Sequence, residues 1–209
     1  MNIKIIDNFL LNEDFNELCS INLKKITENQ IMVYHNKIYK SGKIEIMECI
    51  GENLLKRLFQ NYNEKALNIL KELYPEKVNL YDYSEFHIIE TGSNYKFPIH
   101  DDTPNKLLSG VVYLMPEKNS GTLFYKNKKG DDKKEIEWKR NRGVFFSRSE
   151  KKTWHSYEGD GNSNRIALVY NLMTTNIKEV SKIEKVSFII TLIRYKINPY
   201  LYRFFKFTI

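Results

Sequence analysis

Residues 97–104 read Phe97-Pro98-Ile99-His100-Asp101-Asp102-Thr103-Pro104 and place an imidazole two residues before a carboxylate. On an extended strand, side chains at i and i+2 leave the same face, so we expect His100 and Asp102 to point together. An imidazole and a carboxylate are two-thirds of the facial triad that binds non-haem Fe(II) and leaves coordination positions open. Asp101 should point the opposite way. A chain with four histidines and 26 acidic residues can contain such a pair by chance, so the rest of the sequence has to support it.

A third metal ligand has to come from elsewhere in the chain, and His155 fits this requirement. It lies on the seventh of eight predicted strands, and in a jelly roll the second and seventh strands can face each other at one mouth of the barrel. Arg165 follows ten residues later and opens the apolar strand 166–170. A buried guanidinium is costly without an anion, and a carboxylate ligand held by its planar fork would supply one.

Short β segments follow one another from residue 79 onward. Turn-forming residues separate most of them, as in the stretches 91–94 and 159–162. The predicted strands are 79–90, 95–101, 107–115, 121–127, 133–139, 142–147, 153–158 and 164–173. Eight closely spaced strands after a helical start predict a mainly β protein with a double-stranded β-helix core, the cupin-like jelly roll.

Supporting elements are predicted on the N-terminal side of this core. Residues 3–10 resemble a short strand, and a helix is expected to start at 12–14, where a polar cap precedes acidic residues. Alternation over 31–46 suggests extended structure that is broken at Ser41-Gly42. From Glu52 to Leu73 apolar residues recur every three or four positions, which predicts a long amphipathic helix.

The last segment, 176–209, is predicted to be helical again. Its apolar stripe consists of Val186, Ile189, Ile190, Ile193 and Ile197. We expect this stripe to pack onto the barrel or onto a second copy of the chain as a homo-oligomer contact. Contact with a membrane surface is the alternative. We therefore expect one domain at 1–175, with its β-helix core at about 79–175. A helical C-terminal extension follows at 176–209.

Composition narrows the classes of partner. The formal net charge of +7 comes from Lys spread through Lys/Asn-rich loops and the tail, so no specific nucleic-acid partner is predicted. The N-terminus lacks the apolar region of a signal peptide, and no apolar run approaches the ~20 residues that span a bilayer. These features predict a cytoplasmic protein without a transmembrane segment.

The order and spacing of His100-x-Asp102, His155 and Arg165 resemble the Fe(II)/2-oxoglutarate-dependent dioxygenases, most closely their prolyl-4-hydroxylase-like branch. "IKIIDNFLLNEDF" resembles the first strand and helix of that family, and "VVYLMPEKNSGTLFY" its third and fourth core strands. "RNRGVFFSRSEKKTWHSYEG" resembles the strand pair that leads to the distal histidine. The resemblance is dense over about 79–175, fair at 1–20 and absent from the tail.

The resemblance implies roles for five residues. His100, Asp102 and His155 would be the iron ligands and the catalytic centre. Arg165 would bind the distal carboxylate of the cosubstrate 2-oxoglutarate, and Tyr113 matches a tyrosine that hydrogen-bonds the same carboxylate in related enzymes. The implied cofactors are Fe(II), 2-oxoglutarate and O₂. The implied reaction couples oxidation of a small-molecule or peptidyl substrate to decarboxylation of 2-oxoglutarate to succinate.

Several alternatives remain within and outside this class. Asp102 favours hydroxylation, because related halogenases lack this carboxylate. A nucleobase demethylase of the same superfamily would carry a second arginine six residues after the first, where this chain has Asn171. A non-catalytic jelly-roll module that binds sugar or peptide, with a degenerate metal site, is the alternative from another class. Peptidyl proline, a free amino acid, a glycan precursor and other small metabolites are all open as substrates. His35 and His87 are given no role.

Overall fold

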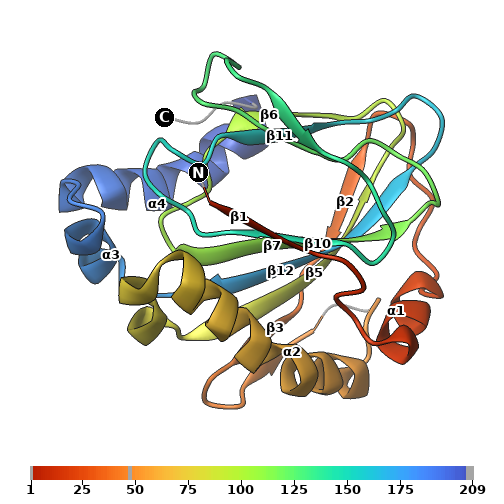
Figure 1. The fold of residues 1–209 in the computed structure, drawn as a ribbon, viewed down its shortest axis with the longest axis horizontal. Coiled ribbons are helices and arrows are strands. Elements are labelled where there is room, and N and C mark those ends of the chain that lie inside the picture. Colours follow the sequence, from red (N-terminus) through yellow and green to blue (C-terminus); the bar gives the residue numbers. More distant parts are fainter. Residues whose placement is uncertain (1, 47–48, 206–209) are drawn as a thin grey trace.

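Two antiparallel sheets face each other in the computed structural model, which describes residues 2–46 and 49–205 (Figure 1). The strands are β1 (Ile3–Ile6), β2 (Ile31–Tyr34), β3 (Lys37–Tyr39), β4 (Ile44–Glu45), β5 (Tyr83–Thr91), β6 (Lys96–His100), β7 (Lys106–Met115), β8 (Thr122–Phe124), β9 (Lys134–Ile136), β10 (Gly143–Phe146), β11 (His155–Glu158) and β12 (Arg165–Met173). The larger sheet has the order β1-β10-β7-β12-β5-β3-β4, with β2 also paired to β5, and the smaller has the order β6-β11-β8-β9. The predicted mainly β jelly-roll class is confirmed.

All eight predicted core strands form, as β5 to β12, and they differ from the prediction at their ends. The clearest difference lies at 79–82, where the predicted strand is wrong. Pro75–Leu80 forms a short 3₁₀ helix, and β5 starts only at Tyr83. A proline in the first helical position has φ already set near the helical value, which favours this turn.

Two helices cover the outer face of the larger sheet: α1 (Asn12–Cys19) and α2 (Glu52–Leu73). Figure 1 shows both below that sheet. Helix α2 has the predicted bounds, and its residues Leu55, Leu58 and Leu70 are fully buried. Helix α1 begins at Asn12, but its N-cap is Leu11 and no side chain caps it, so the predicted polar cap does not form.

Strand β12 separates the core from the interior of the sandwich. Leu168, Tyr170 and Leu172 belong to the hydrophobic core that α2 also enters. The alternating residues Arg165, Ala167, Val169 and Asn171 line a cavity between the two sheets. Because side chains alternate along a strand, one strand can hold the fold with one face and build a site with the other.

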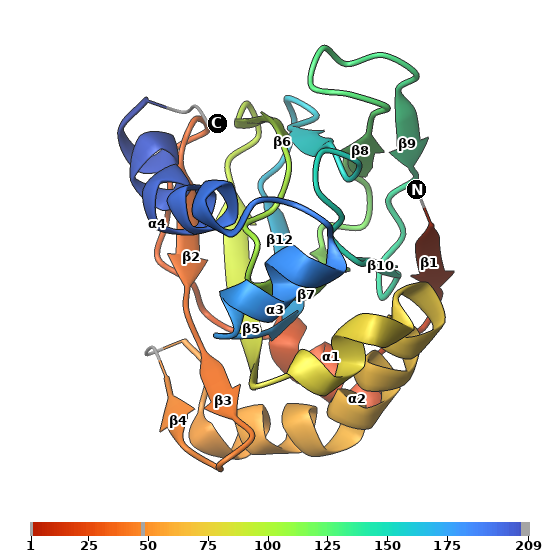
Figure 2. The same ribbon diagram turned by 90° about the vertical axis from the view of Figure 1, so that its left-hand side faces the viewer.

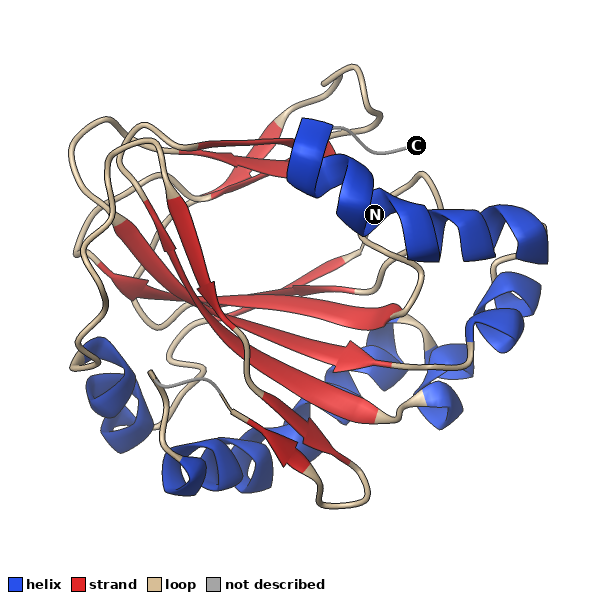
Figure 3. Cartoon of the chain, turned by 180° about the vertical axis from the view of Figure 1, so that it is seen from behind, coloured by secondary structure: helices blue, strands red, loops and turns tan. Residues whose placement is uncertain are grey.

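The C-terminal helices, α3 (Ile177–Ile183) and α4 (Phe188–Phe205), lie on one side of the sandwich (Figures 2 and 3). The predicted helical character of this segment is confirmed for the described residues, but the prediction that the apolar stripe packs onto the barrel is wrong. Ile189, Ile190, Ile193 and Ile197 are exposed. The buried side of α4 is polar and consists of Thr191, Arg194 and Asn198. Within residues 2–46 and 49–205, no helix is both long and apolar enough to cross a membrane.

Candidate metal centre

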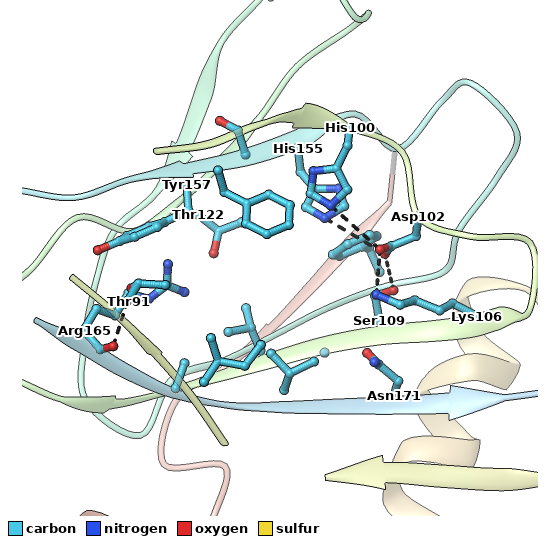
Figure 4. Close-up of a pocket in the computed structure, with 18 of the residues that line it drawn as sticks. Thr91, His100, Asp102, Lys106, Ser109, Thr122, His155, Tyr157, Arg165 and Asn171 are labelled. Carbon is cyan, nitrogen blue, oxygen red and sulfur yellow. Dashed lines mark hydrogen bonds and ion pairs between the residues drawn. The ribbon is translucent and has the colours of Figure 1, made fainter. Parts of the chain in front are cut away.

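His100 and His155 come from neighbouring strands of the smaller sheet. β6 pairs with β11 so that the two residues lie opposite each other, with ring centroids 4.2 Å apart. Asp102 is the second residue after β6, and each imidazole Nε2 lies 4.0 Å from one of its carboxylate oxygens (Figure 4). One donor atom from each residue can be chosen so that all three lie within 4.8 Å of one another. This group could therefore hold a single metal ion.

The backbone orients both imidazoles. Nδ1 of His100 lies 3.0 Å from the carbonyl oxygen of Pro98, and Nδ1 of His155 lies 2.8 Å from that of Thr153. A carbonyl oxygen can only accept, so Nδ1 carries the hydrogen in each contact. The lone pair of each ring is then on Nε2, which faces Asp102. Metal-binding histidines are held in this way by a hydrogen bond from their other nitrogen.

The protonation states also suit a cation. Burial, with His155 nearby, lowers the pKa of His100 to about 3, so this ring is neutral near pH 7. Burial alone would raise the pKa of Asp102, but the Lys106 ammonium beside it holds this pKa well below its usual range. Lys106 Nζ lies 2.7 Å from one oxygen of Asp102, and Ser109 donates to the other. Neutral imidazoles and an ionised carboxylate are the forms that bind metals.

Asp101 points away from this group, as its position between His100 and Asp102 predicts. Its carboxylate accepts hydrogen bonds from the Thr153 hydroxyl and the Lys151 amide. Guanidinium nitrogens of Arg148 and Arg194 each lie 3.7 Å from it. Through Arg194, Asp101 thus connects helix α4 with the loop that contains Asp102.

A cavity of about 180 Å³ extends between the sheets from this group (Figure 4). One water needs only about 10–15 Å³ by this kind of measure, so the cavity has room for a small organic molecule. Its walls between the two polar ends are apolar and include Ile89, Val111, Ala167 and Val169. His100, Asp102 and His155 mark one end and Arg165 the other.

Arg165 is only 6% exposed and is surrounded by aromatic rings. Its guanidinium carbon lies 4.1 Å from the centroid of the Tyr157 ring and 5.2 Å from that of Tyr113. No carboxylate pairs with it within the described part of the chain, and its buried Nε has no hydrogen-bond partner there. Burial lowers the pKa of this guanidinium, because nothing anionic compensates for its lost hydration. The end of the cavity is therefore suited to an anion.

The hydroxyl of Tyr113 is already engaged. It donates to the Thr122 hydroxyl at 2.8 Å and accepts from the Thr122 amide at 2.9 Å. The ring stacks on Trp138, and the residue is fully buried. Its predicted contact with a cosubstrate carboxylate stays a prediction, and Thr122 is the residue of this pair that lines the cavity.

Sequence reasoning missed several residues that line the cavity. Tyr157 stands beside Arg165, and Lys106 and Ser109 hold Asp102. Tyr157 lies two residues after His155 on the same strand, which is a weak signal because the pairing with β6 is irregular between these two residues. No local sequence pattern indicates Lys106 and Ser109. Both lie on β7, and they reach Asp102 only because the chain after Asp102 turns back into that strand.

A second polar cluster lies beyond Asp102. Glu85 accepts from the Asn171 side-chain amide at 3.1 Å and lies 3.2 Å from Nε2 of His87, which in turn is 3.4 Å from His35. Burial would raise the pKa of Glu85, but His87 and Asn171 lower it to about 2. The buried Oδ1 of Asn171 has no partner among the described residues and lies at the cavity.

Comparison with known proteins identifies solved structures that have a similar fold. No family model and no curated protein matches the sequence. A prolyl-4-hydroxylase from Pseudomonas putida superposes with a TM-score of 0.57 at 13% identity, over 82% of this chain and 92% of that one. A prolyl hydroxylase from Trichoplax adhaerens, solved with a peptide fragment of hypoxia inducible factor, gives 0.54 at 15% identity over 88% and 86%. A 2OG-Fe(II) oxygenase family member from Burkholderia pseudomallei gives 0.55 at 10% identity over 82% and 84%.

At these identities the comparison establishes the fold. The chain has the jelly-roll fold of these oxygenase structures, and the resemblance inferred from its sequence is confirmed at that level.

Proposed function

We propose that the protein is an Fe(II)- and 2-oxoglutarate-dependent oxygenase that hydroxylates a small-molecule or peptidyl substrate. The observation that carries the proposal is the content of the cavity. A His-Asp-His group suited to one metal ion lies at one end, and a buried guanidinium without an anion in the described chain lies at the other. A dicarboxylate could bind the metal ion with one end and pair with the buried guanidinium through the other.

The residues present fit these groups. Nε2 of His100, Nε2 of His155 and the Asp102 carboxylate would hold the iron, and Arg165 would hold the distal carboxylate of 2-oxoglutarate. Bound Fe(II), 2-oxoglutarate and O₂ would supply an oxidant for a substrate C–H bond, with succinate and CO₂ as the other products. The Pro98 and Thr153 carbonyls orient the two imidazoles, and Lys106 and Ser109 orient Asp102.

The residues that line the cavity support hydroxylation over halogenation and nucleobase demethylation. Asp102 occupies the position that would have to be free for a halide, which argues against halogenation. Asn171 stands where a nucleobase demethylase would carry its second arginine. The Oδ1 of Asn171, for which the described residues offer no partner, would accept a hydrogen bond from a substrate amide or hydroxyl. Because the Trichoplax enzyme was solved with a peptide, prolyl peptides are the first substrates to test.

Anaerobic titration of the purified protein tests the metal assignment. We expect one Fe(II) per chain, and a charge-transfer band on addition of 2-oxoglutarate. Loss of a hydrogen-bond partner behind a metal ligand costs about 10–100-fold in affinity, so loss of the ligand itself in His100→Ala or His155→Ala should cost more. His35→Ala, a histidine outside the cavity, is the matched control.

Succinate production in air then separates the two classes of function. An oxygenase turns over 2-oxoglutarate, and turnover rises when a substrate such as a prolyl peptide is supplied. A sugar- or peptide-binding module would show no iron-dependent succinate. Full iron occupancy in the His100→Ala, His155→Ala double variant would contradict the ligand assignment.

A further inference from the structure

The exposed apolar side chains of the protein gather on helix α4. Eleven large apolar side chains are exposed in the described part of the chain, and seven of them lie on this one helix. The seven, which we call the α4 apolar face, are Phe188, Ile189, Ile190, Leu192, Ile193, Ile197 and Tyr200. Single exposed apolar residues are ordinary, but a continuous patch marks a contact surface.

This face follows from the helix geometry. Ile189, Ile193, Ile197 and Tyr200 succeed one another at spacings of three and four, so they share one side of the helix. Ile189 is 68% exposed and Tyr200 is 66% exposed. Figure 3 shows α4 running along the outside of the sandwich, with its neighbour α3 at one end.

The polar side of α4 explains why the apolar face points outward. Arg194 is ion-paired with Glu150 and lies 3.7 Å from Asp101. Thr191 and Asn198 are buried with it on the same side. Turning the apolar face inward would remove Arg194 from both carboxylates and leave Asp101 with one cation fewer. A buried charge without its partner is strongly destabilising, so the ion pairs hold the apolar face in contact with the surroundings.

The exposed charges on α3 and α4 are mainly positive. Lys178, Lys182 and Lys185 are exposed on α3 and on the connection to α4, and Lys196 is exposed on α4 itself. The acidic residues of the same stretch are Glu179, which pairs with Lys182, and Glu184, which is buried with Lys77. Lys196 shares the side of the helix that carries Ile193 and Tyr200, being three residues after the first and four before the second.

We propose that α4 docks on the surface of an anionic membrane, with its apolar face in the headgroup region and its lysines on the lipid phosphates. An apolar helix face beside lysines is the pattern of helices that lie in the interface plane. A symmetric pairing of two copies through this face would bring Lys196 and its neighbours toward the same cations of the partner, in a chain of net charge +7. An anionic surface offers the complementary charge.

Flotation of the full-length protein with lipid vesicles tests the proposal. One vesicle preparation is phosphatidylcholine alone, and the other is an equal mixture of phosphatidylcholine and phosphatidylglycerol. We expect the protein to float with the mixed vesicles and to dissociate as salt is raised. Lys196→Glu should weaken partition by at least about fivefold, the usual effect of one basic residue at such a surface. Ile193→Glu should abolish flotation.

Controls keep a folding defect apart from a loss of docking. Ile193 is already exposed, so Ile193→Glu should leave the circular dichroism and the iron binding unchanged. Met32→Glu, at another exposed apolar side chain on β2, should float like the parent. The proposal is overturned if the parent protein stays with the unbound fraction in both vesicle preparations. It is also overturned if light scattering shows a dimer that Ile193→Glu dissociates, because the face would then be a contact between copies.

Discussion

At the scale of single residues, Arg165 is a buried cation with aromatic neighbours and no carboxylate partner among the described residues. Three aromatic rings surround its guanidinium, and its Nε has no partner in the described chain. Cation–π contacts offset part of the cost of burial, but each is worth only about 0.5–2 kcal/mol. We expect an anion that binds next to the guanidinium to offset the rest of this burial cost. Arg165 should therefore control the affinity for 2-oxoglutarate.

Arg165→Ala should therefore weaken 2-oxoglutarate binding more than Tyr113→Phe does. Removal of one partner of a buried ion pair costs about 3–5 kcal/mol, or roughly two to three and a half decades of affinity. Tyr113→Phe removes at most one hydrogen bond to a charged group, about 1.5–3 kcal/mol, and less if the hydroxyl stays on Thr122. The charge-transfer band measures both. Arg140→Ala, which removes an arginine near the surface, is the control. Parent-like binding by Arg165→Ala would contradict the proposal that Arg165 binds the distal carboxylate of 2-oxoglutarate.

Glu85 predicts a dependence of stability on pH. Its pKa in the folded protein is about 2, below the ordinary value of 4.5 for a glutamate, so the ionised carboxylate stabilises the protein fully above about pH 4.5 and loses this effect as the pH falls toward 2. Between pH 6 and pH 3 the difference in unfolding free energy between the parent and Glu85→Gln should shrink by about 2 kcal/mol. Denaturant unfolding at several pH values measures it. A difference that stays constant from pH 6 down to pH 3 would refute the prediction.

At the scale of elements, helix α3 is tied to the site by buried charges. Glu184 directly after α3 binds Lys77 at 2.6 Å and also pairs with Arg148, and both cations are fully buried. Arg148 in turn donates from Nε to the backbone carbonyl of Asp102 at 3.0 Å. The C-terminal helices are therefore connected to the loop that carries one of the proposed iron ligands.

Glu184→Ala should leave Lys77 and Arg148 without an anion that they share. The expected loss is about 3–5 kcal/mol of unfolding free energy, with weaker iron binding because Arg148 also positions the Asp102 loop. Glu179→Ala breaks the exposed pair with Lys182 on the same helix and should cost only about 0–1 kcal/mol. Urea unfolding of both variants compares them directly. Equal losses would show that the buried cluster contributes no more than a surface pair.

At the scale of the whole molecule, the fold and the proposed site rely on different sets of side chains. The main hydrophobic core lies between α2 and the larger sheet, and the cavity lies on the other side of that sheet. The apo protein should therefore be folded, and ligands should add stability to a structure that already exists.

Thermal unfolding under anaerobic conditions should show this addition in two steps. Fe(II) should raise the midpoint, and 2-oxoglutarate at about 100 times its dissociation constant should add about 2.7 kcal/mol, or roughly 5–11 °C for a chain of this length. Chelation of the metal should reverse both steps without unfolding the protein at 25 °C. In Arg165→Ala the second step should be absent. A parent midpoint that does not respond to either ligand would argue against the proposed site.

The sequence by itself determined which residues share a strand or a helix face, because those relations depend only on the local periods of the backbone. Helix α2, the eight core strands and the common face of His100 and Asp102 could be predicted in this way. The order of the strands also predicted that His155 would come back to them, and the two imidazoles do lie opposite each other.

Only the tertiary structure decided which way each face turns and which partner each polar group takes. The period of α4 grouped its isoleucines correctly, but Glu150 and Asp101, distant in sequence, bind Arg194 and so turn that face outward. Thr122 takes the hydroxyl of Tyr113, and Tyr157 comes to stand against Arg165. These outcomes depend on long-range contacts and on the cost of burying an unpaired charge, neither of which a local pattern records.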